Sequence, residues 1–158
     1  MAERSLWHRL RDGAYLRLSL VTRGMTLGVR GVVFDSDGRM LLVRHSYTPG
    51  WHFPGGGVDA GETFYEAMTR ELDEEAGIRV DAPAALHGVF LNHKVSPRDH
   101  VAVFIVRGWT RLREPKPNFE IVETGFFAPD ALPEGTTPGT RRRIAEIIGG
   151  APPIPYWS

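Results

Sequence analysis

Three glutamates at helical spacing are the residues of this chain best suited to chemistry. Glu71, Glu74 and Glu75 lie three and four positions apart, so they are neighbours on one side of a predicted helix. Like charges at these spacings repel by about 0.2–0.5 kcal/mol per pair, and a bound cation would reverse that cost. Residues 56–78 supply only oxygen ligands, since they include no histidine and the chain has no cysteine. Oxygen ligands favour a hard ion such as Mg2+ or Mn2+, and those ions usually accompany phosphates.

A glycine turn and a helix are the elements that must position these acids. A short apolar run, Trp51–Phe53, precedes the turn Pro54–Gly57, where glycines let the backbone turn sharply and approach a ligand. Gly77 is expected to end the helix as its C-cap. The side chains expected to face the core recur at helical spacing, which leaves the three glutamates nearer a rim; they are Phe64, Ala67, Met68 and Leu72.

The segment from Gly56 to Ile78 resembles the Nudix box. That box reads G, five residues, E, seven residues, then R-E-U-x-E-E-x-G-U, where U is aliphatic. Every specified position is matched, by Gly56, Glu62, Arg70, Glu71, Leu72, Glu74, Glu75, Gly77 and Ile78. The flanks agree with it, because a W-x-F-P-G-G sequence leads into the box and FFAPDALP follows at residues 126–133. The resemblance therefore spans residues 26–149.

The resemblance implies both a fold and a reaction. The fold would be α/β (α+β), a Nudix-type α/β/α sandwich with a mixed central sheet. The reaction would be hydrolysis of a diphosphate bond in a nucleoside diphosphate linked to another moiety, by attack of water at phosphorus. Divalent ions suit this chemistry because they neutralise charge on the phosphoryl oxygens and lower the pKa of bound water.

The resemblance also implies roles for individual residues of the box and its flanks. Glu71, Glu74 and Glu75 would bind Mg2+ (or Mn2+), and the backbone carbonyl of Gly55 would complete the ligand set. Arg70 would hold the glutamates in place. Glu62 would either support these groups from behind or cap the helix.

A further acid is expected outside the box. Glu120 occupies the place where relatives often supply another glutamate for metal binding or for general base duty. Glu114 and Glu123 compete with it, and an exposed loop glutamate is the alternative. The general base is left open among Glu120, Glu71 and Glu75, because sequence does not give the distance from a base to the attacking water.

Four cationic or titratable side chains are candidates for substrate binding. Arg44 and His45 end a predicted strand just before the glycine turn, where they either meet substrate phosphates or form a solvated strand end. Arg30 lies inside an apolar strand, so it either pairs with an internal acid or points into a cleft. His52 should face away from Trp51 and Phe53, with its direction relative to substrate open. Aromatic candidates for stacking on a base, each equally explained by packing, are Tyr47, Phe90 and Phe119.

Length and composition predict one domain. The 158 residues can bury a single core, and 42% hydrophobic with 24% charged content is ordinary for a globular protein. Lysine plus arginine equals aspartate plus glutamate at 19 each, so no overall field attracts nucleic acid. The absence of cysteine is compatible with the cytoplasm, which is the expected location. Neither a signal-peptide core nor an apolar run of about 20 residues is found, so no transmembrane segment is expected.

The chain divides into three expected segments. Residues 1–24 would form an amphipathic helix over about residues 3–21 that packs on the domain or in a homodimer, with a membrane surface as the alternative. Residues 25–150 would form the Nudix domain, and the proline-rich residues 151–158 an extended tail. Strands are predicted at 26–34, 40–45, 86–92, 100–108 and 122–127, with a hairpin turn at 35–38 and a last helix at 140–148.

Other functions fit the sequence less well. A non-catalytic nucleotide-binding Nudix module is the main alternative, and loss of a box glutamate would indicate it. A regulator would need a DNA-binding module, for which the flanks are too short. An isomerase of isoprenyl diphosphates normally relies on a catalytic cysteine. The nucleotide-type small-molecule substrate stays open among ADP-ribose, dinucleoside polyphosphates, NADH, nucleotide sugars, oxidised nucleoside triphosphates and capped RNA.

Overall fold

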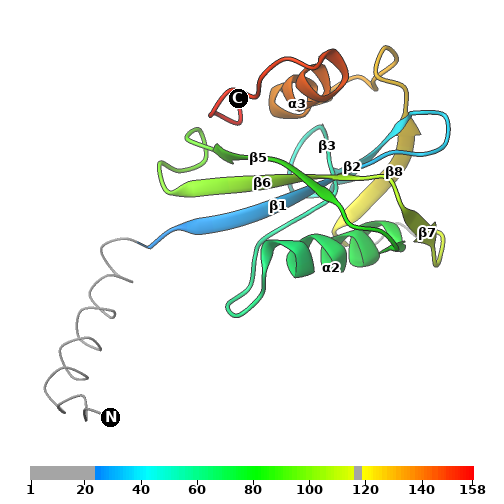
Figure 1. The fold of residues 1–158 in the computed structure, drawn as a ribbon, viewed down its shortest axis with the longest axis horizontal. Helices are drawn as coiled ribbons and strands as arrows, with labels where there is room; N and C mark the ends of the chain where they lie inside the picture. Colours follow the sequence, from blue (N-terminus) through cyan, green and yellow to red (C-terminus); the bar gives the residue numbers. More distant parts are fainter. Residues whose placement is uncertain (1–23, 116–118) are drawn as a thin grey trace, which may run out of the picture.

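Helices α2 (Phe64–Ala76) and α3 (Pro138–Gly149) cover opposite faces of a sheet (Figure 1). The computed structural model describes residues 24–115 and 119–158, so the helix predicted over residues 3–21 lies outside the described residues. The arrangement is the α/β/α sandwich that the sequence predicted. Among the described residues, no helix is long and apolar enough to cross a membrane.

The sheet between the helices is mixed, as predicted. Strand β1 (Thr26–Val33) runs parallel to β6 (Asp99–Val106), which in turn pairs antiparallel with β5 (Ala85–Leu91). A parallel pair needs a long crossover, and α2 lies within the one that joins β1 to β6. The remaining strands form two antiparallel sets, in the orders β3-β2-β8 and β4-β7, with bounds β2 (Met40–His45), β3 (Trp51–His52), β4 (Ile78–Val80), β7 (Trp109–Arg111) and β8 (Ile121–Phe127).

The hairpin turn predicted at residues 35–38 is confirmed, but β1 and β2 pair only next to that turn. Backbone bonds from Asp35 N to Arg39 O at 3.0 Å and from Gly38 N to Asp35 O at 3.2 Å close the turn. A single bridge, Phe34 with Met40, continues it. The strands then diverge, because β1 takes β6 as its partner while β2 takes β3 and β8. The residues of a turn predict the local reversal of the chain. They do not predict which strands pair beyond it.

Each helix packs on its own apolar core. On the α2 side, Ala67, Met68 and Leu72 are fully buried against β1 and β6, as predicted, and Phe64 packs partly buried at the edge. Gly31 of β1 allows this close packing, because a Cβ there would lie 3.0 Å from a Leu72 methyl. The α3 side buries a second set that includes Val32, Met40, Phe53, Phe90, Val103 and Ile144.

Local signals set both ends of α2. Thr63 is the N-cap, and its hydroxyl accepts from the backbone N–H of Glu66 while the Glu66 carboxylate accepts from Thr63 N. This reciprocal pair satisfies two donors that a helix start leaves open. Gly77 ends the helix with φ of 63°, a left-handed conformation that favours glycine, so the predicted C-cap is confirmed.

The C-terminal residues lie across α3 and β5. Leu91 N donates to Pro155 O at 2.9 Å, and Trp157 N donates to Leu91 O at 3.0 Å. Arg143 of α3 is completely buried beneath this segment, with Nη2 at 2.6 Å from Glu146 Oε1 and its guanidinium 3.8 Å from the centroid of the Phe90 ring. Phe90 therefore belongs to the core, and stacking on a base is excluded for it.

Candidate active site

The glycine turn lies between β1 and α2. Val29 N donates to Gly56 O and Gly31 N donates to Pro54 O, both at 2.9 Å, so the turn is bonded along the edge of β1. Gly55 has φ of 143° and a Cβ there would collide with Val29 O. A Cβ on Gly56 would collide with the Glu71 carboxylate. Glycine at both positions lets a box carboxylate and a strand approach the same backbone.

Glu75 is held from two directions inside the protein. Its Oε1 lies 2.6 Å from His45 Nε2, and its Oε2 accepts from Gly55 N at 2.8 Å. Both side chains are buried, with 5% of Glu75 and 6% of His45 exposed. The expectation that Glu75 lies near a rim is therefore wrong. His45 is not a solvated strand end either, because it points inward at a box glutamate.

Glu71 and Glu74 lie on the outer side of the same helix. The Glu71 side chain is 13% exposed, and that of Glu74 is 60% exposed. Burial raises the pKa of Glu71, with the charges of Glu75 and Glu74 acting in the same direction and Arg70 opposing them. Raising a carboxyl pKa makes the group a better proton acceptor near neutral pH.

Arg70 joins these outer acids to the turn. Its guanidinium donates to Glu71 Oε1 at 2.7 Å, to both oxygens of Glu62 at 2.9 and 3.0 Å, and to Gly57 O at 3.0 Å. Glu74 Oε2 lies 3.4 Å from the same side chain. The hydrogen bonds that Arg70 donates to Glu62 and Glu71 raise the pKa of Arg70. The capping alternative for Glu62 is wrong, because Thr63 caps the helix and Glu62 binds Arg70.

Arg30 extends from β1 to the carbonyl side of the turn. Its Nη1 donates to Gly55 O at 2.5 Å and to Phe53 O at 3.1 Å. Burial lowers the pKa of Arg30, and the negative charges of Glu75 and Glu71 oppose that effect. Neither alternative drawn from the sequence describes this arrangement, because the guanidinium bonds to backbone carbonyls at the acid site.

Glu120 approaches the site through Tyr47. The Tyr47 hydroxyl donates to Glu120 Oε1 at 3.0 Å, and the Tyr47 ring centroid lies 5.2 Å from that of His45. Ser46 N donates to Glu120 O at 2.9 Å, which ties this segment to the end of β2. Burial and the Glu120 carboxylate raise the pKa of Tyr47 to about 12, so the phenol keeps its proton.

The competing acids and Arg44 lie elsewhere. Arg44 Nη2 lies 2.7 Å from Glu123 Oε2 in an exposed cross-strand pair, so the structure does not bring Arg44 to the box glutamates. Glu114 lies 3.7 Å from Arg111. His52 shares the side of His45, with ring centroids 5.8 Å apart, and its Nε2 lies 3.1 Å from Pro49 O. Burial, followed by the charge of Arg30, lowers the pKa of His52.

The donor set fits a hard cation but is not gathered as a finished metal cage. Within residues 24–115 and 119–158, no three histidine, aspartate or glutamate side chains converge into a preformed metal site. The reason is that each glutamate is directed to a different partner. Glu71 is bonded to Arg70, and Glu75 is bonded to His45 and Gly55. Glu74 extends outward. The atoms of α2 near the turn that could bind a metal are nevertheless carboxylate oxygens, the ligand type that Mg2+ and Mn2+ prefer.

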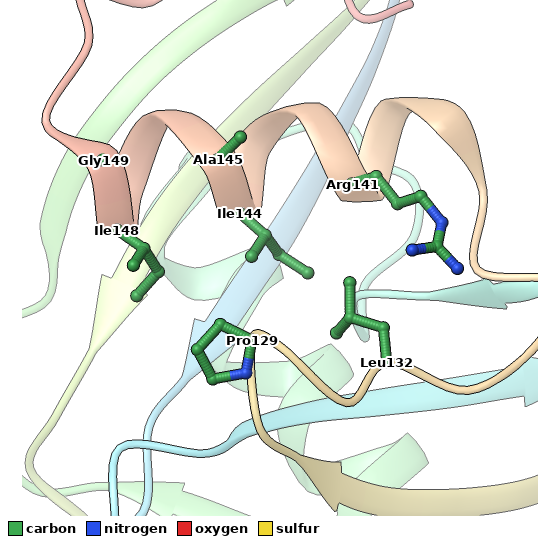
Figure 2. Close-up of a pocket in the computed structure, with 7 residues that line it drawn as sticks. All are labelled: Pro129, Leu132, Arg141, Ile144, Ala145, Ile148 and Gly149. Carbon is green, nitrogen blue, oxygen red and sulfur yellow. The ribbon is translucent and has the colours of Figure 1, made fainter.

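An apolar pocket of about 430 Å3 lies away from these acids. It is formed by α3 and the loop after β8, and Figure 2 shows Ile144, Ile148 and Leu132 directed into the space between them. Arg141 at its edge donates from Nε to Thr136 O at 3.1 Å. Because α3 covers the face opposite α2, this pocket is separate from the box glutamates (Figure 1).

The family assignment follows from a match along most of the chain. The sequence model of the NUDIX domain matches residues 24–147. The chain belongs to the Nudix family. It is a hydrolase of phosphoanhydride bonds, as the box predicted.

Nudix relatives with different printed activities resemble this chain. It is 29% identical over 126 residues to a putative 8-oxo-dGTP diphosphatase of Bacillus subtilis, covering 80% of this chain and 82% of that protein. It is 36% identical to the RNA pyrophosphohydrolase of Coxiella burnetii over 60% of this chain, which spans only 34% of that longer protein. Among solved structures, the MutT NUDIX hydrolase of Burkholderia pseudomallei superposes with a TM-score of 0.66 and 28% identity, covering 77% of this chain and 97% of that one.

The contact between His45 and Glu75 is the site feature that sequence reasoning missed. A signal for it exists, because Leu41, Val43 and His45 alternate along β2 and so share one face. Leu41 packs in the core on the α2 side, which is the side that carries Glu75. Extending the alternation by one step would have placed His45 facing the box helix.

Proposed function

We propose that this Nudix protein is a divalent-metal-dependent pyrophosphohydrolase that cleaves a diphosphate bond in a nucleoside diphosphate linked to another moiety. The observation that supports it most is the glycine turn fixed between Glu71 and Glu75. Gly56 leaves room for the Glu71 carboxylate, and Gly55 N donates to Glu75 Oε2 at 2.8 Å. A diphosphate and its counter-ions could approach backbone and carboxylates together at this point.

The metal ligands in this proposal are Glu71, Glu74, Glu75 and the carbonyl of Gly55, with Glu120 as a further acid. A bound Mg2+ or Mn2+ would neutralise charge on the phosphoryl oxygens and activate water. Arg70 holds the outer glutamates, since its guanidinium bonds both Glu71 and the turn carbonyl of Gly57.

Glu71 is the general base that we favour among the three acids left open. Burial raises its pKa, which suits a group that must accept a proton. Both oxygens of Glu75 already have partners, whereas Arg70 bonds Glu71 through Oε1; Glu120 joins the site through Tyr47 rather than from the box helix. Glu71 would therefore take the proton of the water that attacks phosphorus.

The substrate class is a nucleotide-type small molecule or a nucleotide end. The relatives named above act, by their names, on 8-oxo-dGTP or on RNA, so the shared chemistry is the diphosphate. His52 stays a candidate for contact with the attached group, because it lies beside His45 on the site side. The cytoplasmic location and the homodimer expected from the sequence stay predictions.

A substrate panel with and without metal tests the proposal. Oxidised nucleoside triphosphates, ADP-ribose, dinucleoside polyphosphates and triphosphorylated RNA would be incubated with Mg2+, Mn2+ or a chelator. We expect metal-dependent release of a nucleoside monophosphate from at least one compound, or of pyrophosphate from the RNA. Glu74→Gln should lower kcat/KM about 100-fold, because the exposed Glu74 binds metal rather than supporting the fold.

The matched control is Glu114→Gln, which changes a glutamate outside the box that is also exposed, at 83% against 60% for Glu74. Its kcat/KM should equal that of the wild type. If the kcat/KM of Glu74→Gln equalled those of the wild type and Glu114→Gln, the role of Glu74 as a metal ligand would be contradicted. Tight nucleotide binding with no hydrolysis of any compound would instead support a non-catalytic module.

A further inference from the structure

Arg30 brings a second positive charge, besides that of Arg70, to the acids of the site. Its Nη1 lies 2.5 Å from the carbonyl oxygen of Gly55 and 3.1 Å from that of Phe53. The same Gly55 donates its N–H to Glu75 at 2.8 Å. One residue of the turn is therefore bonded to a cation through its carbonyl and to an anion through its amide.

Two arginines offset the negative charge of the box acids from opposite sides. Arg70 lies on the outer side and binds Glu62, Glu71 and, at longer range, Glu74. Arg30 lies on the inner side, where Glu75 and Glu71 are the acids that favour its charged form. Repulsion between box carboxylates at helical spacing is thereby offset in the protein without an added ion.

A carbonyl bonded to a guanidinium is a poorer ligand for a second cation. Each positive charge raises the electrostatic potential at the position of the other and so disfavours it, and the effect is strong where solvent is partly excluded. The Gly55 carbonyl is also the backbone ligand that we assigned to the divalent ion. Arg30 and that ion therefore use the same oxygen and are attracted by the charges of the same carboxylates.

We propose that Arg30 is a resident cation of the active site, which holds the Gly55 carbonyl in its ligand position and competes with the divalent ion for it. The proposal rests on the proposed function, because it takes Gly55 and Glu75 as metal ligands. The turn is then ordered before metal arrives, and metal binding in the absence of substrate is weakened. Each cation weakens the interaction of the other with the site by the same free energy, as coupled ligands do.

Mn2+ binding without substrate tests this competition. Arg30→Gln keeps a hydrogen-bond donor and removes the charge, so we expect it to bind Mn2+ about tenfold more tightly than the wild type. Arg30→Lys keeps the charge and should bind Mn2+ within about threefold of the wild type. Free Mn2+ would be measured by electron paramagnetic resonance during titration. Should Arg30→Gln not fold, Arg30→Met repeats the titration with a neutral side chain of similar length.

Thermal unfolding supplies a readout that needs neither substrate nor catalysis. Metal-free Arg30→Gln should melt at a lower temperature than the metal-free wild type. Saturating Mn2+ should raise the melting temperature of Arg30→Gln by more than it raises that of the wild type. Arg39→Gln is the matched control, because it removes an equal charge from a side chain that binds Asp35 outside the site. This control should leave Mn2+ affinity unchanged.

The outcomes separate this inference from the proposed function. The competition would be overturned if Arg30→Gln bound Mn2+ no more tightly than the wild type. An arginine that only binds substrate would give that result. Failure of the proposed function would look different: neither protein would bind Mn2+ at the box, and Glu74→Gln would not change either titration. Tighter binding by Arg30→Gln that Glu74→Gln abolishes would support both.

Discussion

The inner and outer halves of the active site use the same carboxylate chemistry in different surroundings. The inner half pairs buried Glu75 with His45 and Gly55, and the outer half pairs Glu71, Glu62 and Glu74 with a half-buried Arg70. A buried carboxylate that loses its partner carries a large desolvation cost, whereas water reaches the outer half, where Glu74 and part of Arg70 are exposed, and can replace a lost partner there. The inner half should therefore govern stability, and the outer half should govern activity.

His45→Leu should produce the largest loss of stability. It leaves the Glu75 carboxylate without its 2.6 Å partner in a buried place, so the free energy of unfolding should fall by about 3 kcal/mol. Urea unfolding of the metal-free protein measures it. Arg44→Leu, one residue earlier on the exposed face of the strand, should cost less than about 1 kcal/mol. Equal losses in the two variants would remove the distinction between the halves.

Gly56→Ala should reduce activity more than stability. The new Cβ would collide with the Glu71 carboxylate, which lies at the end of a flexible side chain and can move away. Displacement of the proposed base should lower kcat about 100-fold. Gly57→Ala is the adjacent control, since a Cβ there meets nothing within 4 Å. Steady-state kinetics on the best substrate would show the difference, and a Gly56→Ala enzyme with full kcat would refute the placement of Glu71.

Arg70→Lys probes the outer half alone. Lysine keeps the charge but loses the planar fork that binds Glu62, Glu71 and Gly57 together. We expect kcat/KM to fall about tenfold, with a change in unfolding free energy below about 0.5 kcal/mol. Arg79→Lys, at an exposed pair with Asp81, should change neither quantity. A loss of stability as large as that of His45→Leu would place Arg70 in the supporting structure of the fold.

The smallest effect should be a pH dependence of stability caused by Glu71. Its pKa is raised in the folded protein, so between the unfolded and the folded pKa the folded state binds more protons. Stability of the metal-free protein should therefore fall as pH rises from the unfolded toward the folded pKa of Glu71. Glu71→Gln should lose that slope in melting temperatures measured against pH. A slope that persists in Glu71→Gln would assign it to another group.

Much of this architecture could be read from local sequence signals. The box helix, its end at Gly77 and the longer strands depend on periodicity and turn residues that act within a few positions, whereas the mixed sheet was implied by the Nudix resemblance. The start at Thr63 with Glu66 also has such a signal, the T-x-x-E capping pattern, although sequence reasoning considered only Glu62, as one of two alternatives, for the cap. Strands β4 and β7 were not predicted, because three-residue strands carry too little pattern.

The inner half of the site could not be predicted in the same way. Arg30 lies in a strand whose two faces are both covered, so alternation does not show where its long side chain ends. The contact between His45 and Glu75 joins residues 30 positions apart and depends on how α2 packs on the sheet. Partner choice over such distances is decided by tertiary packing, which is also why the hairpin at residues 35–38 did not extend.

Crystals soaked with Mn2+ test the central claim most directly. Anomalous scattering would locate the ion, and we predict a peak bounded by Glu71, Glu74 and Glu75 and by the Gly55 carbonyl. The three carboxylates should turn toward that peak, with Arg70 still bonded to Glu62. An absence of any peak at high Mn2+ concentration, with Glu71 and Glu74 directed into bulk solvent, would contradict a metal-dependent active site on this helix.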